Sequence, residues 1–273
     1  MPEVSIITVY YNTPEELLKL FDSIEKYLEP SVYEFIVADN NSESNLSAKL
    51  SSIKYIRFNE NLGFGKACNR AAEQATAPIL FFMNPDSELI HNCLPPMLVA
   101  MKDFAVAGPQ VINSDRSLQL SFGPFLSIAA EAKQRFLTKH ERDVWVQRWI
   151  AQKTAGPFYP DYVSGCALMI RTSVFQQLHG FDEDFFLYNE DVDLCARAQQ
   201  AGHKIVYIPS AQLIHHRNRS VQKEPNRVKV EYRRSQILYY RKHLSKLSLL
   251  GLRLYLTIKF VLQWSMLRVI WGR

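Results

Sequence analysis

The sequence predicts an α/β fold with a mostly parallel central sheet that is flanked by helices. Short apolar runs rich in β-branched and aromatic residues, such as residues 4–10 and 79–83, have the length and composition of buried strands. Segments with the spacing of amphipathic helices separate these runs, and strands that alternate with helices form right-handed βαβ units. A chain of 273 residues, 47% of them hydrophobic, can bury the core of such a domain.

The first 112 residues supply these elements in regular order. The strand at 4–10 is followed by a helix whose start carries a cap, a first-turn proline and a capping-box acid at Thr13, Pro14 and Glu16. We then expect a strand at 34–38, a short helix after Ser42, a strand at 54–58, a helix at 66–75, a strand at 79–83, a helix entered through Pro95 and Pro96, and a strand at 104–108.

The second half is less regular. Residues 113–160 hold a candidate hairpin strand at 117–122 and a long helical stretch at 127–151, which we interpret as an insertion over the site. Strand character returns at 162–171. A helix capped by Asn189 and ended by Gly202 follows, and then two short strands at 204–209 and 212–216.

Polar residues follow three of the expected strands, at Asn12, Asp39 and Asp86. The carboxyl ends of parallel strands share one edge, which is where ligands of open α/β sheets bind. Asp86 directly follows the strand at 79–83, so it is well placed to hold a metal ion. The alternative is that residues 84–87 form only a turn, because Asn, Pro, Asp and Ser are common turn residues.

Two further features at this edge suit a nucleotide. The Asp39 carboxylate could accept the N3–H of a uracil or thymine ring, or it could instead close an Asx turn with the residues that follow. The loop Gly63-Phe64-Gly65 opens a helix beside Lys66, and helix starts and basic side chains both favour phosphate. The loop is neither a P-loop nor a full dinucleotide fingerprint, so a plain turn is the alternative.

Acids and histidines in the second half offer further chemistry. Glu190, Asp191 and Asp193 begin a helix beside an aromatic loop, where partial desolvation raises the basicity of a carboxylate, as a general base requires. The helix dipole, which attracts acids, is the other explanation. His215 and His216 follow a strand and could bind a divalent transition metal, or they could be structural.

Seven motifs in this order resemble those of the family 2 glycosyltransferases, which have the GT-A fold with a Rossmann-like sheet. They occupy residues 4–12, 37–42, 61–65, 83–87, 165–167, 190–194 and 215–216. Within the family, the chain is most similar to the rhamnosyltransferase-like branch of bacterial polysaccharide assembly, O-antigen included. The resemblance covers roughly residues 3–220.

The resemblance implies an inverting transferase that uses a nucleotide-diphospho-sugar. Asp39 would read the pyrimidine base, and Asp86 would bind Mg²⁺ or Mn²⁺ with His216 or His215 completing the shell. Asp191, with Glu190 beside it, would take the proton of the acceptor hydroxyl. The implied donor contacts are Thr8, Tyr10, Asn12, Asp39, Asn61, Gly63, Lys66, Asn84 and Asp86, and the implied sugar and acceptor pocket includes Gly165, Cys166 and Tyr188. Gly165 allows a close approach of a ligand.

One position departs from the broader family pattern. That family usually has Asp-x-Asp after the fourth strand, whereas this chain has Asn84-Pro85-Asp86. The asparagine form is similar to the rhamnosyltransferase-like branch, and it leaves one carboxylate for the metal instead of two. We divide the chain accordingly into a catalytic domain at 1–220, with a nucleotide-binding half at 1–112 and an acceptor-binding half at 113–220, and a tail at 221–273.

The tail is strongly basic. From Arg217 to Arg273 there are 14 Lys and Arg against 2 acids, so this segment carries +12 and the rest of the chain −7. Charged residues such as Arg253 and Lys259 interrupt its apolar run. We therefore predict an amphipathic helix lying on an anionic membrane, with Trp264 and Trp271 at interface depth. The alternative is packing on the domain or on a second copy as a homodimer; nucleic acid is not expected, since no binding motif is present.

Four cysteines without metal-ligand spacing and an N-terminus without a signal peptide predict free thiols in the cytoplasm, on the inner face of the plasma membrane. The predicted activity is the transfer of rhamnose from dTDP-rhamnose to a glycan or polyprenol-linked glycan acceptor. The rivals are a UDP-hexose donor, a non-catalytic assembly protein with a degenerate site, and a nucleotidyltransferase. A nucleotidyltransferase would carry a glycine- and basic-rich loop for a triphosphate near the N-terminus, and this chain has no such loop there.

Overall fold

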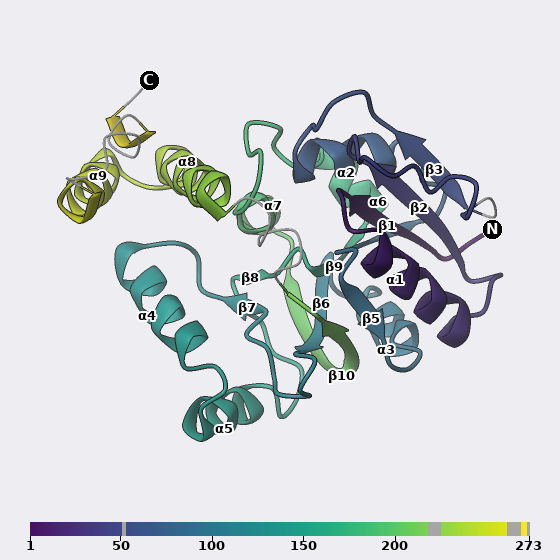
Figure 1. Ribbon diagram of the computed structural model, residues 1–273. Coiled ribbons are helices and arrows are strands. Elements are labelled where there is room, and N and C mark those ends of the chain that lie inside the picture. Colours follow the sequence, from purple (N-terminus) through teal and green to yellow (C-terminus); the bar gives the residue numbers. More distant parts are fainter. Residues whose placement is uncertain (51–52, 218–224, 261–268, 272–273) are drawn as a thin grey trace.

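Eight strands form one mixed sheet in the part of the chain that the computed structural model describes, residues 1–50, 53–217, 225–260 and 269–271 (Figure 1). Its strand order is β3-β2-β1-β4-β9-β6-β10-β5. These strands are β1 (Val4–Tyr10), β2 (Tyr33–Asp39), β3 (Lys54–Arg57), β4 (Ile79–Met83), β5 (Ser87–Leu89), β6 (Val106–Ile112), β9 (Ala167–Arg171) and β10 (Ile205–His215). A separate ribbon pairs β7 (Phe122–Gly123) with β8 (Tyr162–Val163).

Helices cover both faces of this sheet (Figure 1). One apolar core joins a face of the sheet to α1 and α3, and a second core joins the other face to α2, α4, α5, α6 and α7. The helices of the domain are α1 (Pro14–Tyr27), α2 (Phe64–Ala72), α3 (Leu94–Ala100), α4 (Ile128–Lys139), α5 (Val144–Lys153), α6 (Thr172–Gln177) and α7 (Glu190–Gln200).

The sheet confirms the predicted α/β class. Strand β1 pairs in parallel with β2 and with β4, and β2 pairs in parallel with β3, so these carboxyl ends share one edge. Strand β9 is antiparallel to β4 and to β6, and it joins the first strands to the parallel pair β6–β10. Strands from both sides of residue 112 therefore lie in one sheet, and the division into two halves stays a prediction about function.

Three predicted strands have different limits. The segment 162–171 is broken because residues 164–166 turn, with the Ala167 N–H donated to the Ser164 carbonyl at 3.2 Å. The candidate hairpin strand is reduced to a bridge at Leu118 and to the two residues of β7. The two final strands are one strand, β10, whose register shift between Ile208 and Gln212 keeps both parts paired with β6.

The helix predictions also needed correction. The described residues between Ser42 and residue 50 form turns where a short helix was expected, and the stretch 127–151 is divided between α4 and α5. Helix α6 and strand β5 were not predicted. Thr13 and Asn189 occupy N-cap positions, but neither side chain makes the capping hydrogen bond. Asn189 is left-handed (φ 63°), outside the extended conformation that turns a cap side chain toward the helix.

The tail packs on the domain. Helix α8 (Pro225–His243) buries Tyr239 and Tyr240 in a third apolar cluster, which also contains Val192 of α7 and Leu256 of α9 (Lys246–Phe260). The alternative prediction of packing on the domain is therefore correct for α8. Helix α9 keeps exposed apolar side chains at Leu247, Leu250, Leu254 and Ile258.

Within the described ranges, every helix is too short or too polar to cross a bilayer. Trp271 is partly exposed and donates its Nε1–H to Thr257 Oγ1 at 2.7 Å. The expectation for Trp264 falls outside the described residues.

Candidate functional site

Asp86 lies in the turn between β4 and β5, beside His215 at the end of β10. The carboxylate is 8% exposed, and its Oδ1 lies 3.2 Å from His215 Nε2. Asn84 Nδ2 is 3.2 Å from the same ring nitrogen. Burial alone would raise the pKa of Asp86, but the hydrogen bond and charge of His215 bring it below its ordinary value. A carboxylate, an amide and an imidazole thus meet at the end of β4.

His216 faces away from this group. Its Nε2 lies 2.8 Å from Glu88 Oε2 and its Nδ1 lies 2.8 Å from Ser114 Oγ, while only its backbone N–H reaches the Asp86 carbonyl. Successive strand residues point to opposite sides, so two adjacent histidines cannot both face Asp86. The structure brings His215, rather than His216, to the carboxylate.

Gln119 orients the His215 ring. With its amide oxygen turned to the ring, Gln119 accepts a hydrogen bond from His215 Nδ1 at 3.0 Å. Because its Nδ1–H is donated to Gln119, the ring would bind a metal ion through Nε2, and the Nε2 proton shared with Asp86 would leave when the ion binds.

Asp86 and His215 fit two positions of a divalent metal shell. Two ligands at right angles around an octahedral ion lie about 3 Å apart, which matches the spacing of these two side chains. An imidazole ligand favours Mn²⁺ over Mg²⁺. The described residues contain no group of three or more His, Cys, Asp or Glu side chains suited to a metal, so donor oxygens and water would have to fill the other positions.

A single turn, residues 164–166, links the Asp86 group to Asp191. The Cys166 carbonyl accepts the Asn84 N–H at 3.0 Å, and the Gly165 N–H donates to Asp191 Oδ2 at 2.7 Å. A Cβ on Gly165 would lie 3.2 Å from Asp191 Cβ, so the close approach expected at Gly165 is made by Asp191. Burial raises the pKa of the Cys166 thiol to about 12, so an uncharged side chain separates Asp86 from Asp191.

Asp191 lines a cavity of about 590 Å³ between α4, the start of α7 and α8. Burial raises the pKa of Asp191, although the Gly165 and Val192 N–H groups oppose the shift. Tyr188 lines the same cavity, and its ring packs edge-on against Tyr232 of α8 at 5.8 Å. Tyr188 has a left-handed backbone (φ 71°), which is costly for a non-glycine residue and concentrates at functional sites.

Glu190, the neighbouring acid, points elsewhere. It does not line the cavity, and its Oε2 is buried without a hydrogen-bond partner among the described residues. Burial, and then the charge of Asp191, raise its pKa well above its ordinary value. Of the two acids, Asp191 alone has access to a ligand in the cavity.

Asp39 is fully buried and forms the Asx turn that we kept as an alternative. Its Oδ1 accepts the Ser42 N–H at 2.8 Å, and its Oδ2 accepts the Tyr55 hydroxyl at 2.8 Å and lies 3.3 Å from Arg57. A carboxylate offers about four lone-pair positions, so about one remains for a base N–H. The carboxylate has no exposed surface, however, so the structure shows the Asx turn and leaves the base contact a prediction.

Asn61 and Gly63 shape the loop before α2. Asn61 Oδ1 accepts from Asn40 Nδ2 at 2.9 Å and from the Gly63 N–H at 3.0 Å. Gly63 has a φ of 83°, and a Cβ there would lie 2.4 Å from the Phe186 carbonyl oxygen, so only glycine fits. Lys66 is partly exposed, with its Nζ 3.8 Å from Glu183 Oε2.

The remaining predicted donor residues lie in or near the core. Tyr10 is fully buried and its hydroxyl donates to the Ser44 carbonyl at 3.0 Å, which turns the ring away from the surface. Thr8 is also fully buried, and its Oγ1 has no partner among the described atoms. Asn12 is left-handed (φ 55°) and its Oδ1 accepts the Glu43 N–H at 2.8 Å.

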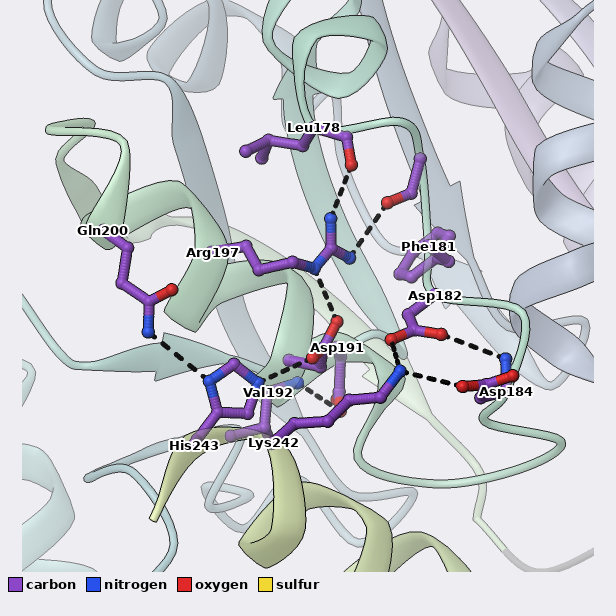
Figure 2. A network of polar contacts seen from close by, with 12 residues as sticks. Leu178, Phe181, Asp182, Asp184, Asp191, Val192, Arg197, Gln200, Lys242 and His243 are labelled. Carbon is purple, nitrogen blue, oxygen red and sulfur yellow. Dashed lines mark hydrogen bonds and ion pairs between the residues drawn. The ribbon is translucent and has the colours of Figure 1, made fainter. Parts of the chain in front are cut away.

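Figure 2 shows how the end of α8 is fastened to α7. His243 Nε2 lies 2.7 Å from Asp193 Oδ1, and Arg197 Nε lies 2.7 Å from the other oxygen of the same carboxylate. Lys242 pairs with Asp182 and with Asp184. Sequence reasoning missed these contacts and the cavity-lining residues of α4 and α8. The basic charge of the tail pointed toward α8, and the interpretation of residues 113–160 as an insertion over the site pointed toward α4.

Comparisons with known proteins agree with this arrangement. Residues 5–178 match the family described as Glycosyl transferase family 2, and residues 125–271 match Glycosyl transferase family group 2. The N-acetylglucosaminyl-diphospho-decaprenol L-rhamnosyltransferase of Mycobacterium tuberculosis is 27% identical over 240 residues, or 81% of this chain and 78% of the relative. The dTDP-rhamnosyl transferase RfbF of Shigella flexneri is 24% identical over 224 residues, or 77% of this chain and 67% of the relative.

A solved structure shares the fold. The mannosyltransferase PcManGT from Pyrobaculum calidifontis, in complex with GDP-Man and Mn²⁺, superposes with a TM-score of 0.60 at 14% identity, over 88% of this chain and 64% of that one. This likeness confirms the predicted GT-A fold. The chain belongs to glycosyltransferase family 2 and is an enzyme of that family.

Proposed function

We propose that the chain is an inverting, metal-assisted glycosyltransferase that moves rhamnose from dTDP-rhamnose to a diphosphate-linked glycan acceptor. The names of the two relatives support this proposal. One is a dTDP-rhamnosyl transferase, and the other is named for an N-acetylglucosaminyl-diphospho-decaprenol acceptor. The proposed setting is the assembly of a cell-surface polysaccharide such as O-antigen.

The observation that carries the proposal is the turn at residues 164–166. It contacts the Asp86 group on one side and Asp191 on the other, so a donor held at the strand ends would place its sugar near the base. The acceptor hydroxyl oxygen attacks the anomeric carbon, the bond from that carbon to the diphosphate oxygen breaks, and its electron pair leaves with the nucleoside diphosphate. Asp191 Oδ takes the hydroxyl proton, because a raised pKa makes its carboxylate a stronger base.

Asp86 and His215 would hold the metal ion, which supplies positive charge to the leaving diphosphate. Asn84 contacts the same imidazole nitrogen and would orient it. The proposed nucleoside contact is the Asp39 carboxylate, which is buried beside the partly exposed Arg57 at 3.3 Å, so binding of the base would have to displace Arg57. Each of these groups is fixed by the sheet edge rather than by a free loop, and this favours a preorganised donor site.

The tail gives the proposed location. Helix α9 exposes apolar side chains, and the chain from Arg217 to Arg273 carries +12, which together suit peripheral contact with an anionic membrane on the cytoplasmic side. The proposed sugar-transfer reaction does not depend on this membrane contact. A homodimer through the C-terminal helices would compete for the same apolar face.

A UDP-hexose donor is the second candidate, since a structural relative, GalNAc-T7, was solved with UDP, GalNAc and Mn²⁺. Nucleotide release should be measured over dTDP-rhamnose, UDP-hexoses and GDP-mannose, with a membrane extract as the acceptor source. Release from UDP-sugars only would reject the rhamnose assignment, and release from none would favour a non-catalytic assembly protein.

The same assay tests the base. We expect Asp191→Asn to lose about 100- to 10,000-fold in turnover, as removal of a general base does. The exposed Asp103→Asn is the matched control and should keep wild-type turnover. Retained turnover in Asp191→Asn would reject the base assignment while leaving the donor assignment intact.

A further inference from the structure

The cavity beside Asp191 contains a buried arginine without an acid to neutralise it. Arg233 of α8 is 8% exposed and lines the cavity. The Arg233 guanidinium donates a hydrogen bond to a neutral partner, Gln236 Oε1, at 2.5 Å, and otherwise lies over the rings of Tyr232 and Phe260. No carboxylate within the described ranges pairs with it. A guanidinium has five N–H donors, and leaving a buried charge unpaired is costly.

Glu131, the acid on the same wall, is occupied by other donors. Its carboxylate accepts from Gln236 Nε2 at 2.5 Å and from the Tyr240 hydroxyl at 2.9 Å, and it lies 3.4 Å from the Tyr232 hydroxyl. These bonds tie α4 to α8 and form one side of the cavity. The contacts of Glu131 therefore stabilise the wall without supplying a direct partner for Arg233.

Two more cations line the cavity from α4. Arg135 and Lys139 are four residues apart and so lie on one face of that helix. Burial lowers the pKa of Arg233 most, and the like charge of Arg135 also lowers it, although Tyr232 and Glu131 act in the opposite direction. Because Arg233 and Arg135 line the same cavity, their charges repel each other. An anion between them would remove this repulsion and satisfy the unused donors.

We propose that Arg233 and Arg135 bind a diphosphate group of the acceptor in this cavity, with Lys139 adding charge at its edge. Two arginines suit this group because planar guanidinium forks match phosphate oxygens in pairs. The proposal rests on the proposed function in one respect. It assigns the diphosphate to the acceptor because the cavity lies at Asp191, the base for the acceptor hydroxyl, whereas the donor residues lie at the strand ends.

The surroundings favour a diphosphate that carries an apolar chain. Ile128 of α4 is 43% exposed and lies against α9 at Gly251. The exposed Leu250 and Leu254 belong to the same helix. A prenyl diphosphate could therefore place its charged group at the arginines and its chain along α9.

The test uses binding and needs no turnover. Inorganic pyrophosphate, inorganic phosphate and farnesyl diphosphate would be titrated into the whole protein by calorimetry, with EDTA present so that no metal-dependent donor site contributes. We expect farnesyl diphosphate to bind most tightly and phosphate most weakly. Arg233→Gln and Arg135→Gln should each weaken both diphosphates about 10- to 100-fold. Equal affinity for phosphate and pyrophosphate would overturn the diphosphate assignment.

Lys133→Gln is the matched control, because Lys133 is an exposed cation of the same helix that does not line the cavity. If all three variants bind pyrophosphate equally, the proposal is wrong. If Arg233→Gln fails to fold in a thermal melt, Arg135→Gln alone decides, since Arg135 is exposed. Nucleotide release by the wild type is measured in parallel, so a failure of the proposed function is seen there and leaves the binding result unchanged.

Discussion

Replacing Gly165 with alanine should slow sugar transfer without unfolding the protein. The new Cβ would lie 3.2 Å from Asp191 Cβ and 3.5 Å from its Oδ2. Gly165 does not have a left-handed backbone, so alanine can adopt its conformation. The substitution therefore acts on the position of the Asp191 side chain and leaves the carboxylate itself in place.

The size of the effect follows from the spacing. Two carbons pack best about 3.5–4.0 Å apart, so Asp191 or the turn has to move by about 0.3–0.8 Å. A misplacement of about 1 Å at a reacting group costs about 100-fold in rate. We therefore expect kcat to fall about 5- to 50-fold, which corresponds to roughly 1–2 kcal/mol of transition-state stabilisation. Crowding of a buried contact also costs about 1–3 kcal/mol of folding free energy.

The assay is nucleotide release with saturating donor and acceptor, beside a donor titration by calorimetry and a thermal melt. Gly156→Ala is the matched control, since a Cβ at Gly156 would contact nothing within 4 Å. Donor affinity should be the same in both variants. A Gly165→Ala protein that is folded and has the kcat of Gly156→Ala would refute the argument that this turn positions the catalytic base.

Three further predictions concern the donor side and the stability of the sheet. Gly63→Ala should cost about 3 kcal/mol of folding free energy in thermal melts, and Gly202→Ala about 1 kcal/mol. Both glycines have a φ of 83°, but only a Cβ at Gly63 would clash with a backbone carbonyl. Equal losses of stability in the two variants would rule out the clash. Burial alone would raise the pKa of Glu34, but its hydrogen-bond donors hold it at about 2, below the ordinary 4.5, so its stabilisation is complete above pH 4.5 and is lost as the pH falls through 2. Glu34→Gln should therefore cost about 1–2 kcal/mol in urea unfolding at pH 7 and much less at pH 3, and a loss independent of pH would contradict this sign. His215→Ala should weaken Mn²⁺ activation about tenfold or more, whereas His216→Ala should change it less than about twofold, and the reverse order in a Mn²⁺ titration would exchange their roles.

The alternation of apolar strands and amphipathic helices predicted the sheet class because burial on both faces leaves a strong local pattern. Local pattern does not encode strand partners. Strand β9 has the same apolar sequence pattern as its neighbours, yet it runs antiparallel between β4 and β6, because strand direction depends on the path of the connecting chain. The sequence also did not predict the break in the strand at residues 164–166, because Cys166 is as apolar as the strand that follows it.

The acids of the site were predictable because strand ends and a helix start place them at one edge. Their environments were not. Asp191 and Glu190 are adjacent in sequence, but Asp191 lines a cavity, whereas Glu190 is buried with an unpartnered carboxyl oxygen among the described residues. For His215 and His216, the period of a strand requires opposite faces, while only the pairing of β5 with β10 decides which histidine meets Asp86.

The tail shows most clearly how charge can mislead a sequence-based argument. Its +12 suggested a surface that binds an anionic membrane, yet some of these cations face inward. Arg233 lines the cavity of Asp191, and Lys242 pairs with the acids at 182 and 184. His243, which is not counted in that charge, contacts Asp193 on the helix that carries the proposed base. A segment that only anchored the enzyme would not need these contacts. Because α8 supplies both a wall of the cavity and a support for α7, we propose that the catalytic domain extends to His243, and we assign the proposed membrane contact to the exposed apolar face of α9.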